Sequence, residues 1–246
     1  MNIKPFVAPL AVAVVTVGTI TATASGAFAA TPDSSTSAHT HHAHLGKDAT
    51  LQQIQAAGAT ATKSRITKLD EALKKVDADK TLTSSDRSML VATLHTDLSG
   101  MQQVQTKIAA DTTATQARTD YTTIFRQYRV IAVTLPQERI VRDADRVTAK
   151  GLPHLQAVET KLSDRIAKKS DASQAAKTAL TDLQKQISTV QSDAQGLSTA
   201  ALAVTPAQYN QSHTVMSSLR TKVKALRTAE KAAQKDIRTI RHDLRG

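Results

Sequence analysis

The chain has 246 residues, no cysteine, an aromatic content of 2% and a formal net charge of +11. The lack of cysteine excludes a disulfide framework, so burial of apolar side chains must hold the fold together. Scarce aromatic residues disfavour β-sheets, whereas abundant Ala, Leu, Gln and Lys favour long helices with thin apolar stripes. The composition therefore predicts an all-α protein.

Residues 1–29 have the order of a signal peptide. Lys4 precedes an apolar stretch over residues 6–20, and small residues follow at Ala27 and Ala29. The alternative is an uncleaved membrane anchor, but polar and helix-breaking residues interrupt the stretch, which is also short for a span. We predict cleavage after Ala29 and a mature protein that is secreted or associated with the cell envelope.

Residues 30–46 form a leader rich in Ser and Thr, with almost nothing to bury, and we predict that it is flexible. It contains four histidines whose neutral imidazoles are common ligands of transition metals. These histidines are His39, His41, His42 and His44. One hypothesis is an exported metal-binding protein that uses this site. The alternative is weak, adventitious binding, because the sequence shows no neighbouring groups that would orient the imidazole rings.

The first two predicted helices form a hairpin. Apolar residues recur at intervals of three and four over residues 51–76, which predicts a helix that begins near Ala49 and is capped by Asp48. Thr83 and Asp86 predict a capping box, in which the Thr83 hydroxyl accepts from the Asp86 amide and the Asp86 carboxylate accepts from the Thr83 amide. The short connection makes the two helices antiparallel neighbours.

The middle of the chain is less regular. Residues 129–135 are largely apolar and β-branched, which is typical of a short extended connector, and a turn and a continuous bend are the open alternatives for this join. Pro136 suits the first turn of a third helix, with Thr134 and Gln137 as candidate caps. We expect a kink at Pro153, because a proline inside a helix removes a hydrogen bond and clashes with the preceding turn.

The last two predicted helices have the most regular pattern. Apolar side chains alternate at four and three over residues 176–204, and again over 206–244. Sustained heptads predict coiled-coil-like packing. The fold is thus expected to be an elongated bundle of antiparallel helical hairpins with about five long helices, divided into regions 47–135 and 136–246. Self-association through these seams is a further hypothesis.

Two segments resemble a known group of proteins. The first is Leu82-Thr83-Ser84-Ser85-Asp86-Arg87, followed by the helix over 94–108; the second runs from Tyr128-Arg129-Val130 through Leu135-Pro136-Gln137 to Asp143-Ala144-Asp145-Arg146. Over roughly residues 60–150 the chain resembles uncharacterised secreted helical proteins of high-GC Gram-positive bacteria. The resemblance implies export and helical hairpins, and supplies no activity and no site residues.

The positive charge is unevenly distributed. Residues 121–170 contain 10 basic and 5 acidic side chains and residues 206–246 contain 9 and 3, whereas residues 45–120 contain 10 and 9. Such a field attracts polyanions, here an anionic cell-wall polymer or a membrane surface. The alternative is that the charges only keep helix faces hydrated. The candidate residues for an anionic partner are Arg126, Arg129, Arg139, Arg142, Arg146, Lys222, Lys224, Arg227, Lys231, Lys235, Arg238 and Arg241.

Tyr121, Phe125 and Tyr128 are spaced four and three, with Arg126 between the last two and Arg129 directly after them. Aromatic rings beside arginines can stack on sugars or bases while the guanidinium groups hold phosphates. Three rings on one helical face are also typical of a core. Both alternatives, a binding surface and packing between hairpins, are open at this stage.

The sequence contains no nucleophile elbow, phosphate loop, paired-histidine zinc helix or cysteine nucleophile. Carboxylates such as Glu138, Asp143 and Asp145 lie among arginines, which favours ion pairing over acid and base catalysis. We therefore predict a non-enzymatic, exported scaffold or adaptor protein. We infer no small-molecule substrate, and no cofactor apart from a transition metal at the histidine leader.

Overall fold

The computed structural model describes residues 45–245, which belong to one compact unit comprising residues 43–246. The predicted signal peptide and the four leader histidines lie outside the described residues. The helical elements are α1 (Leu51–Ala78), α2 (Ser84–Ala110), α3 (Ala114–Thr123), η1 (Ile124–Tyr128), α4 (Thr134–Arg146), η2 (Val147–Gly151), α5 (Leu152–Lys168), α6 (Gln174–Ala194), α7 (Leu197–Leu202), α8 (Pro206–Gln211) and α9 (Thr214–Asp243), with η1 and η2 π-helical. The described residues contain no strand, which confirms the all-α prediction.

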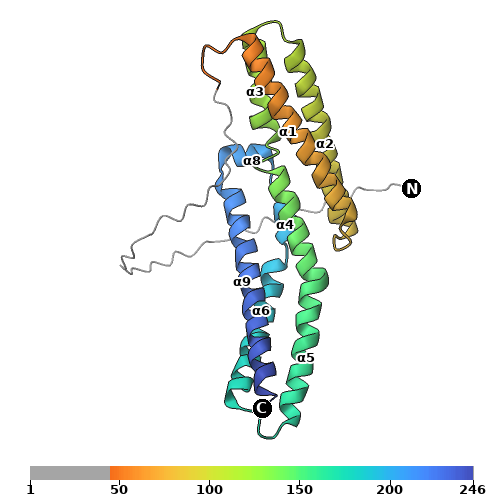
Figure 1. Cartoon of the computed structure of the whole chain (residues 1–246), viewed down its shortest axis with the longest axis vertical. Helices are drawn as coiled ribbons and strands as arrows, with labels where there is room; N and C mark the ends of the chain where they lie inside the picture. The colour runs from red at the N-terminus through yellow and green to blue at the C-terminus, as the bar shows by residue number, and fades with distance from the viewer. Residues whose placement is uncertain (1–44, 246) are drawn as a thin grey trace, which may run out of the picture. The chain divides into compact units, whose positions relative to one another are not determined.

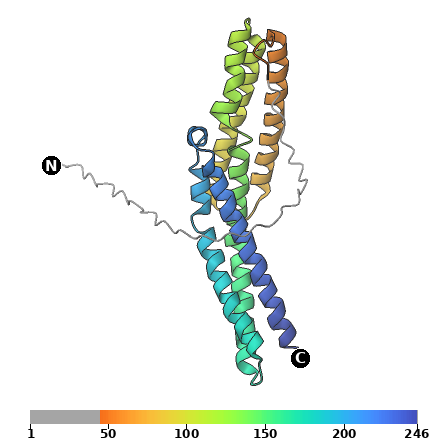
Figure 2. The same ribbon diagram turned by 90° about the vertical axis from the view of Figure 1, so that its left-hand side faces the viewer.

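The helices of this unit form an elongated arrangement (Figure 1). α1 and α2 make an antiparallel hairpin that α3 joins, while α5, α6 and α9 pack together at the other end (Figure 2). α4 lies between these groups and contacts α1, α2, α7 and α9. α4 and α9 run in the same direction, side by side. None of the described helices is both long enough and apolar enough to cross a membrane.

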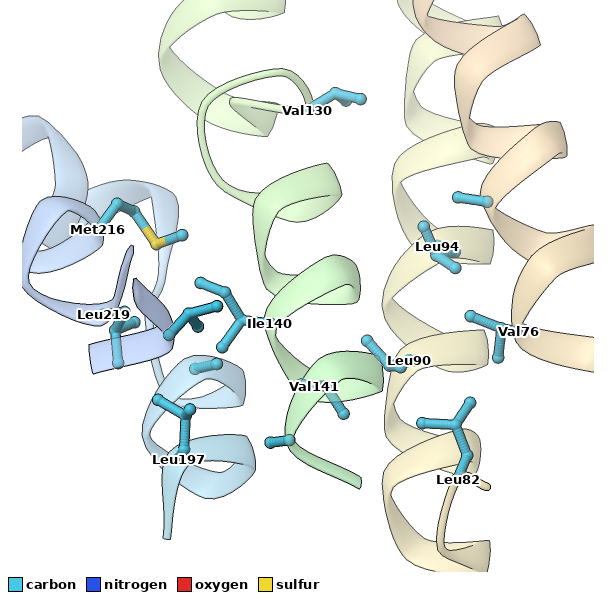
Figure 3. Close-up of a cluster of buried hydrophobic side chains, with 14 of the residues drawn as sticks. Val76, Leu82, Leu90, Leu94, Val130, Ile140, Val141, Leu197, Met216 and Leu219 are labelled. Carbon is cyan, nitrogen blue, oxygen red and sulfur yellow. The ribbon is translucent and has the colours of Figure 1, made fainter. Parts of the chain in front are cut away.

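The apolar core passes through α4. Val141 of α4 lies toward Leu90 of α2, whereas Ile140 lies on the opposite side, toward Met216 and Leu219 of α9 (Figure 3). A second cluster is formed by α5, α6 and the C-terminal half of α9. The apolar stripes predicted from the spacing therefore face one another inside the unit, and α4 is the element that joins the N-terminal hairpin to α9.

α1 begins later than predicted, and the cap is a different residue. The Thr50 hydroxyl accepts a hydrogen bond from the Gln53 amide at 3.3 Å, and Gln53 Oε1 accepts from the Thr50 amide at 2.9 Å. The expectation of an Asp48 cap before Ala49 is wrong. The Ala49 amide instead donates to the Gly46 carbonyl in a turn, and the reciprocal Thr50–Gln53 pair satisfies the first free amides of the helix.

Only half of the capping box predicted at Thr83 and Asp86 is present. The Thr83 hydroxyl accepts from the Asp86 amide at 3.1 Å, as predicted. The Thr83 amide, however, donates to Oδ2 of Asp145 at 2.9 Å, not to the Asp86 carboxylate. A buried carboxylate from α4 thus replaces the local partner, because α4 packs against the α1–α2 turn.

Residues 129–133, between η1 and α4, form a tight turn, so the join is the turn among the open alternatives and not an extended connector. Arg129 adopts a left-handed conformation with φ 51°, and its carbonyl accepts from the Val133 amide at 2.7 Å. The Leu135 amide donates to the Val130 carbonyl at 2.9 Å. Val130 and Val133 are buried, so the apolar run reflects burial of the turn and not a strand.

α4 begins at Thr134, two residues before Pro136, which lies in its first turn. The two candidate caps have other partners. The Thr134 hydroxyl donates to the Asp97 carboxylate of α2, and Gln137 Nε2 donates to the Ala201 carbonyl at 2.8 Å. Both side chains are buried and join α4 to neighbouring elements, so the prediction that they cap the helix is wrong.

The irregularity expected at Pro153 takes the form of the π-helical segment η2, directly before α5. The Leu152 amide donates to the Val147 carbonyl across this wider turn. A π-helical turn is one of the ordinary ways in which a helix accommodates a local break in its hydrogen-bond ladder. Pro153 then occupies the first turn of α5, where a missing amide is tolerated.

The two long C-terminal helices are each interrupted. Gly196, with φ 71°, separates α6 from α7, and the Ser212–His213 pair separates α8 from α9. The buried apolar stripe continues across the first break, since Leu197 and Ala201 of α7 are buried as well. The expected number of five long helices is therefore approximate, although the stripes themselves are present.

Candidate functional site

A basic groove lies between α4 and α9. Its volume is about 650 Å³. In the described part of the chain its lining combines five cationic side chains with a single carboxylate. These residues are Arg139, Asp143, Arg220, Lys224, Arg227 and Lys231. We refer to this hollow as the α4–α9 groove.

The spacing of α9 explains why its cations share one side of the groove. Arg220, Lys224, Arg227 and Lys231 are separated by four, three and four residues, which places them on one helical face. All four are exposed, and so is Arg139 on the α4 wall. Buried apolar residues of the two helices lie beneath them and hold the walls together, so the fold presents the cations on a supported surface.

Asp143 connects the two walls of the α4–α9 groove. Its Oδ1 accepts from Nη2 of Arg146 at 2.9 Å, and its Oδ2 accepts from Nη2 of Arg227. Both arginine side chains are more than half exposed, so each ion pair contributes at most about 1 kcal/mol. The pairs orient Arg227 and reduce the positive charge at this position, whereas the other four cations of the lining form no ion pair among the described residues.

A second hollow of about 510 Å³ adjoins Arg146, and its lining includes Lys150, His154 and Glu230. Burial raises the pKa of Glu230, Arg146 and Arg227 oppose that shift, and Asp143 adds to it. The approach of Glu230 to the backbone is close, because a Cβ atom at Gly151 would lie 2.9 Å from its Oε1. That atom is the end of a flexible side chain, so a Cβ atom at residue 151 would require only a shift of the Glu230 carboxylate.

Arg142 is not part of the α4–α9 groove. Its Nε donates to Asp79 Oδ2 and its Nη1 to Glu138 Oε1, each at 2.8 Å. Burial opposes ionisation of Asp79, but hydrogen bonds from Thr81 and Arg142 outweigh it and lower the pKa of Asp79 to about 2. Arg142 therefore fastens α4 to the C-terminal end of α1.

Two further candidate arginines lie near the turn before α4. Arg129 Nε donates to Asn210 Oδ1 at 2.7 Å, and its guanidinium lies 5.3 Å from the ring centroid of Tyr209. The Arg126 carbonyl accepts from Asn210 Nδ2 at 2.8 Å. The remaining candidates are exposed on α9 outside the lining of the α4–α9 groove: Lys222, Lys235, Arg238 and Arg241.

The three aromatic candidates pack against the core. Tyr121 and Phe125 meet edge to face, with ring centroids 5.0 Å apart, and the Arg65 guanidinium lies 4.7 Å from the Phe125 centroid. Tyr128 covers Gly100 of α2 so closely that a Cβ atom there would lie 2.1 Å from its ring. These contacts are of the kind expected for packing between hairpins, the alternative to a binding surface.

The structure brings together four of the predicted basic residues and adds one that the sequence analysis missed. Arg139, Lys224, Arg227 and Lys231 line the α4–α9 groove with Arg220. The signal for Arg220 was available, because it precedes Lys224 by four residues and continues the same face. The described residues contain no group of three or more His, Asp or Glu side chains arranged to hold a metal ion, and the metal hypothesis for the leader falls outside these residues.

Comparisons of the chain with protein-family models, with curated proteins and with solved structures gave no match.

Proposed function

We propose that this protein is an exported, non-enzymatic scaffold or adaptor that the α4–α9 groove holds to an anionic component of the cell envelope. The observation that carries the proposal is the convergence of five cations from two helices on one groove that contains a single carboxylate among the described residues. Clustered cations on a supported surface create a local potential that attracts anions and accelerates their association.

The character of the side chains supports an anionic partner. Arginine offers a planar fork of donors for phosphate or carboxylate oxygens, and lysine adds a mobile point charge. Because each contact is exposed, a single one is weak, and useful affinity needs several contacts at once. The mechanism is therefore multivalent electrostatic attachment, which salt weakens.

Export is part of the proposal and is supported by the sequence order of residues 1–29. The resemblance of residues 60–150 to secreted helical proteins supports the same cellular location. Self-association receives less support, because the apolar faces of α6 and α9 are buried inside the unit. Among the described residues, Met89 is the one large apolar side chain that is exposed.

Co-sedimentation with isolated cell walls tests the proposal. In the groove variant, Arg139, Arg220, Lys224 and Lys231 are changed to Gln, which leaves the Arg227–Asp143 pair intact. The matched control changes four exposed lysines of α1 to Gln, with the same loss of charge. These lysines are Lys63, Lys68, Lys74 and Lys75.

We expect the groove variant to bind roughly ten- to a hundredfold more weakly than the unchanged protein, at a few tenths to 1 kcal/mol per contact. The control should bind within about threefold of the unchanged protein, since its charges are dispersed along another helix. Equal weakening of both variants would mean that net charge, and not the groove, determines binding. Circular dichroism of each variant verifies that the helices are retained.

A further inference from the structure

The α4–α9 groove carries an inference about the class of ligand, which rests on the proposed function. We propose that the groove takes a linear, phosphate-bearing polymer that lies parallel to α9 and engages several phosphates at once. A membrane surface and a single anion both fit the groove less well.

The length of the basic stripe favours a polymer over a single anion. At 1.5 Å per residue, Arg220 and Lys231 are about 16 Å apart along the axis of α9, and successive cations are separated by about 4.5 to 6 Å. One phosphate group reaches one or two of these side chains. A chain that repeats its charge along its length contacts all of them in turn.

The shape of the groove favours a chain over a bilayer. Cations stand on both walls, with Arg139 on α4 facing the stripe on α9, and the lining between them includes Ile140 and Val223, which are buried. A planar array of lipid head groups rests on the rims of two adjacent helices and cannot fill the space between them. An extended polymer enters the hollow and meets both walls.

The lining also indicates which part of the polymer is recognised. None of the described residues that line the groove is aromatic. Proteins that hold single-stranded nucleic acid usually stack bases on aromatic side chains. The groove has charged groups for phosphates and no ring for a base, so it recognises the repeated phosphate and is indifferent to bases attached to the polymer.

The test uses the full chain and titration calorimetry at fixed ionic strength. The probes are orthophosphate, tripolyphosphate, inorganic polyphosphate of increasing length, a single-stranded oligonucleotide with a matched number of phosphates, and vesicles of anionic phospholipid at matched charge. We expect the dissociation constant to fall at least tenfold from orthophosphate to a chain that spans about 16 Å, and then to level off. Vesicles should bind at least tenfold more weakly than the polymer. The oligonucleotide should bind no more tightly than polyphosphate with the same number of phosphates.

Single variants assign the effect to the groove. Arg139→Gln should weaken polyphosphate binding about threefold, whereas Lys222→Gln, on α9 but outside the lining, should leave it within experimental error. Orthophosphate or vesicles that bind as tightly as the polymer would overturn the inference while leaving the proposed anionic attachment intact. Failure of every anion to bind would overturn both.

Discussion

Asp145 of α4 accepts a hydrogen bond from the backbone amide of Thr83 at 2.9 Å, and this contact joins the N-terminus of α2 to a helix distant in the sequence. The other oxygen, Oδ1, accepts from the Ser198 hydroxyl at 2.8 Å. The Asp145 residue is 6% exposed. A single buried carboxylate therefore links α2, α4 and α7, at the place where α4 connects the N-terminal hairpin to the remainder of the unit.

Asp145→Ala should destabilise the protein by about 2 to 3 kcal/mol, because a free helical amide and a hydroxyl lose their acceptor in a buried site. Urea denaturation followed by circular dichroism measures the change. Asp164→Ala, at an exposed position of α5, is the control and should change stability by less than about 0.5 kcal/mol. Similar losses in the two variants would show that Asp145 has no special role in joining the helices.

The Asp86 carboxyl gives a pH dependence. Burial raises its pKa, and Asp145 raises it further, while a hydrogen bond with Thr83 opposes the shift. The folded state therefore binds the proton of the Asp86 carboxyl more tightly than the unfolded state does. The protonated carboxyl contributes its full stabilisation of the folded state below the pKa of the unfolded state, and this contribution is lost as the pH rises through the pKa of the folded state. Asp86→Asn should therefore gain stability relative to the unchanged protein between pH 4 and pH 7. Urea denaturation at the two pH values measures this gain, and a difference independent of pH would contradict it.

Gly100→Ala tests the packing of Tyr128 on α2. In an exposed helix this change stabilises by about 1 kcal/mol. Here the added Cβ would lie 2.1 Å from the Tyr128 ring, so we expect a loss of about 1 to 3 kcal/mol in the free energy of unfolding. Combining it with Tyr128→Leu should recover part of the loss. A stabilised single variant would show that Tyr128 does not cover Gly100.

Asp143→Asn should strengthen binding of polyphosphate about two- to fivefold, because it removes the carboxylate from the groove lining and releases Arg227 from its ion pair. Fluorescence anisotropy with a labelled polyphosphate measures the change. Asp193→Asn on α6 carries the same change in charge and should raise affinity by less than twofold. An Asp143 variant that binds no more tightly than this control would mean that the carboxylate does not compete with the ligand.

Apolar spacing was sufficient to predict the all-α class, the α1–α2 hairpin and the faces that become buried. It did not predict the breaks at Gly196 and at Ser212–His213, because heptad spacing continues whether the backbone is helical or turns between two packed segments. At Thr83 the sequence predicted the hydrogen bond of the hydroxyl but not that of the backbone amide. The partner of that amide, Asp145, comes from α4, and a local sequence pattern carries no information about which helices become neighbours.

The same limit applies to the candidate site. Charge counts predicted a basic C-terminal helix, and the spacing of Lys224, Arg227 and Lys231 places them on one face. Arg142 resembled its neighbour Arg139 in the sequence, yet Arg142 faces inward to Asp79 and Glu138 while Arg139 faces the groove. Only the packing of α4 against α1 and α9 separates the two roles.

The dependence of polyphosphate affinity on salt tests the role of the α4–α9 groove most directly. For a polyanion, the slope of log K against log salt concentration reports the number of phosphate charges that the protein neutralises. With Arg139, Arg220, Lys224 and Lys231 changed to Gln, the slope should become shallower by about 2 to 4, while the α1 lysine control retains the slope of the unchanged protein. A slope that is unaltered in the groove variant, or altered equally in the control, would contradict binding at this groove.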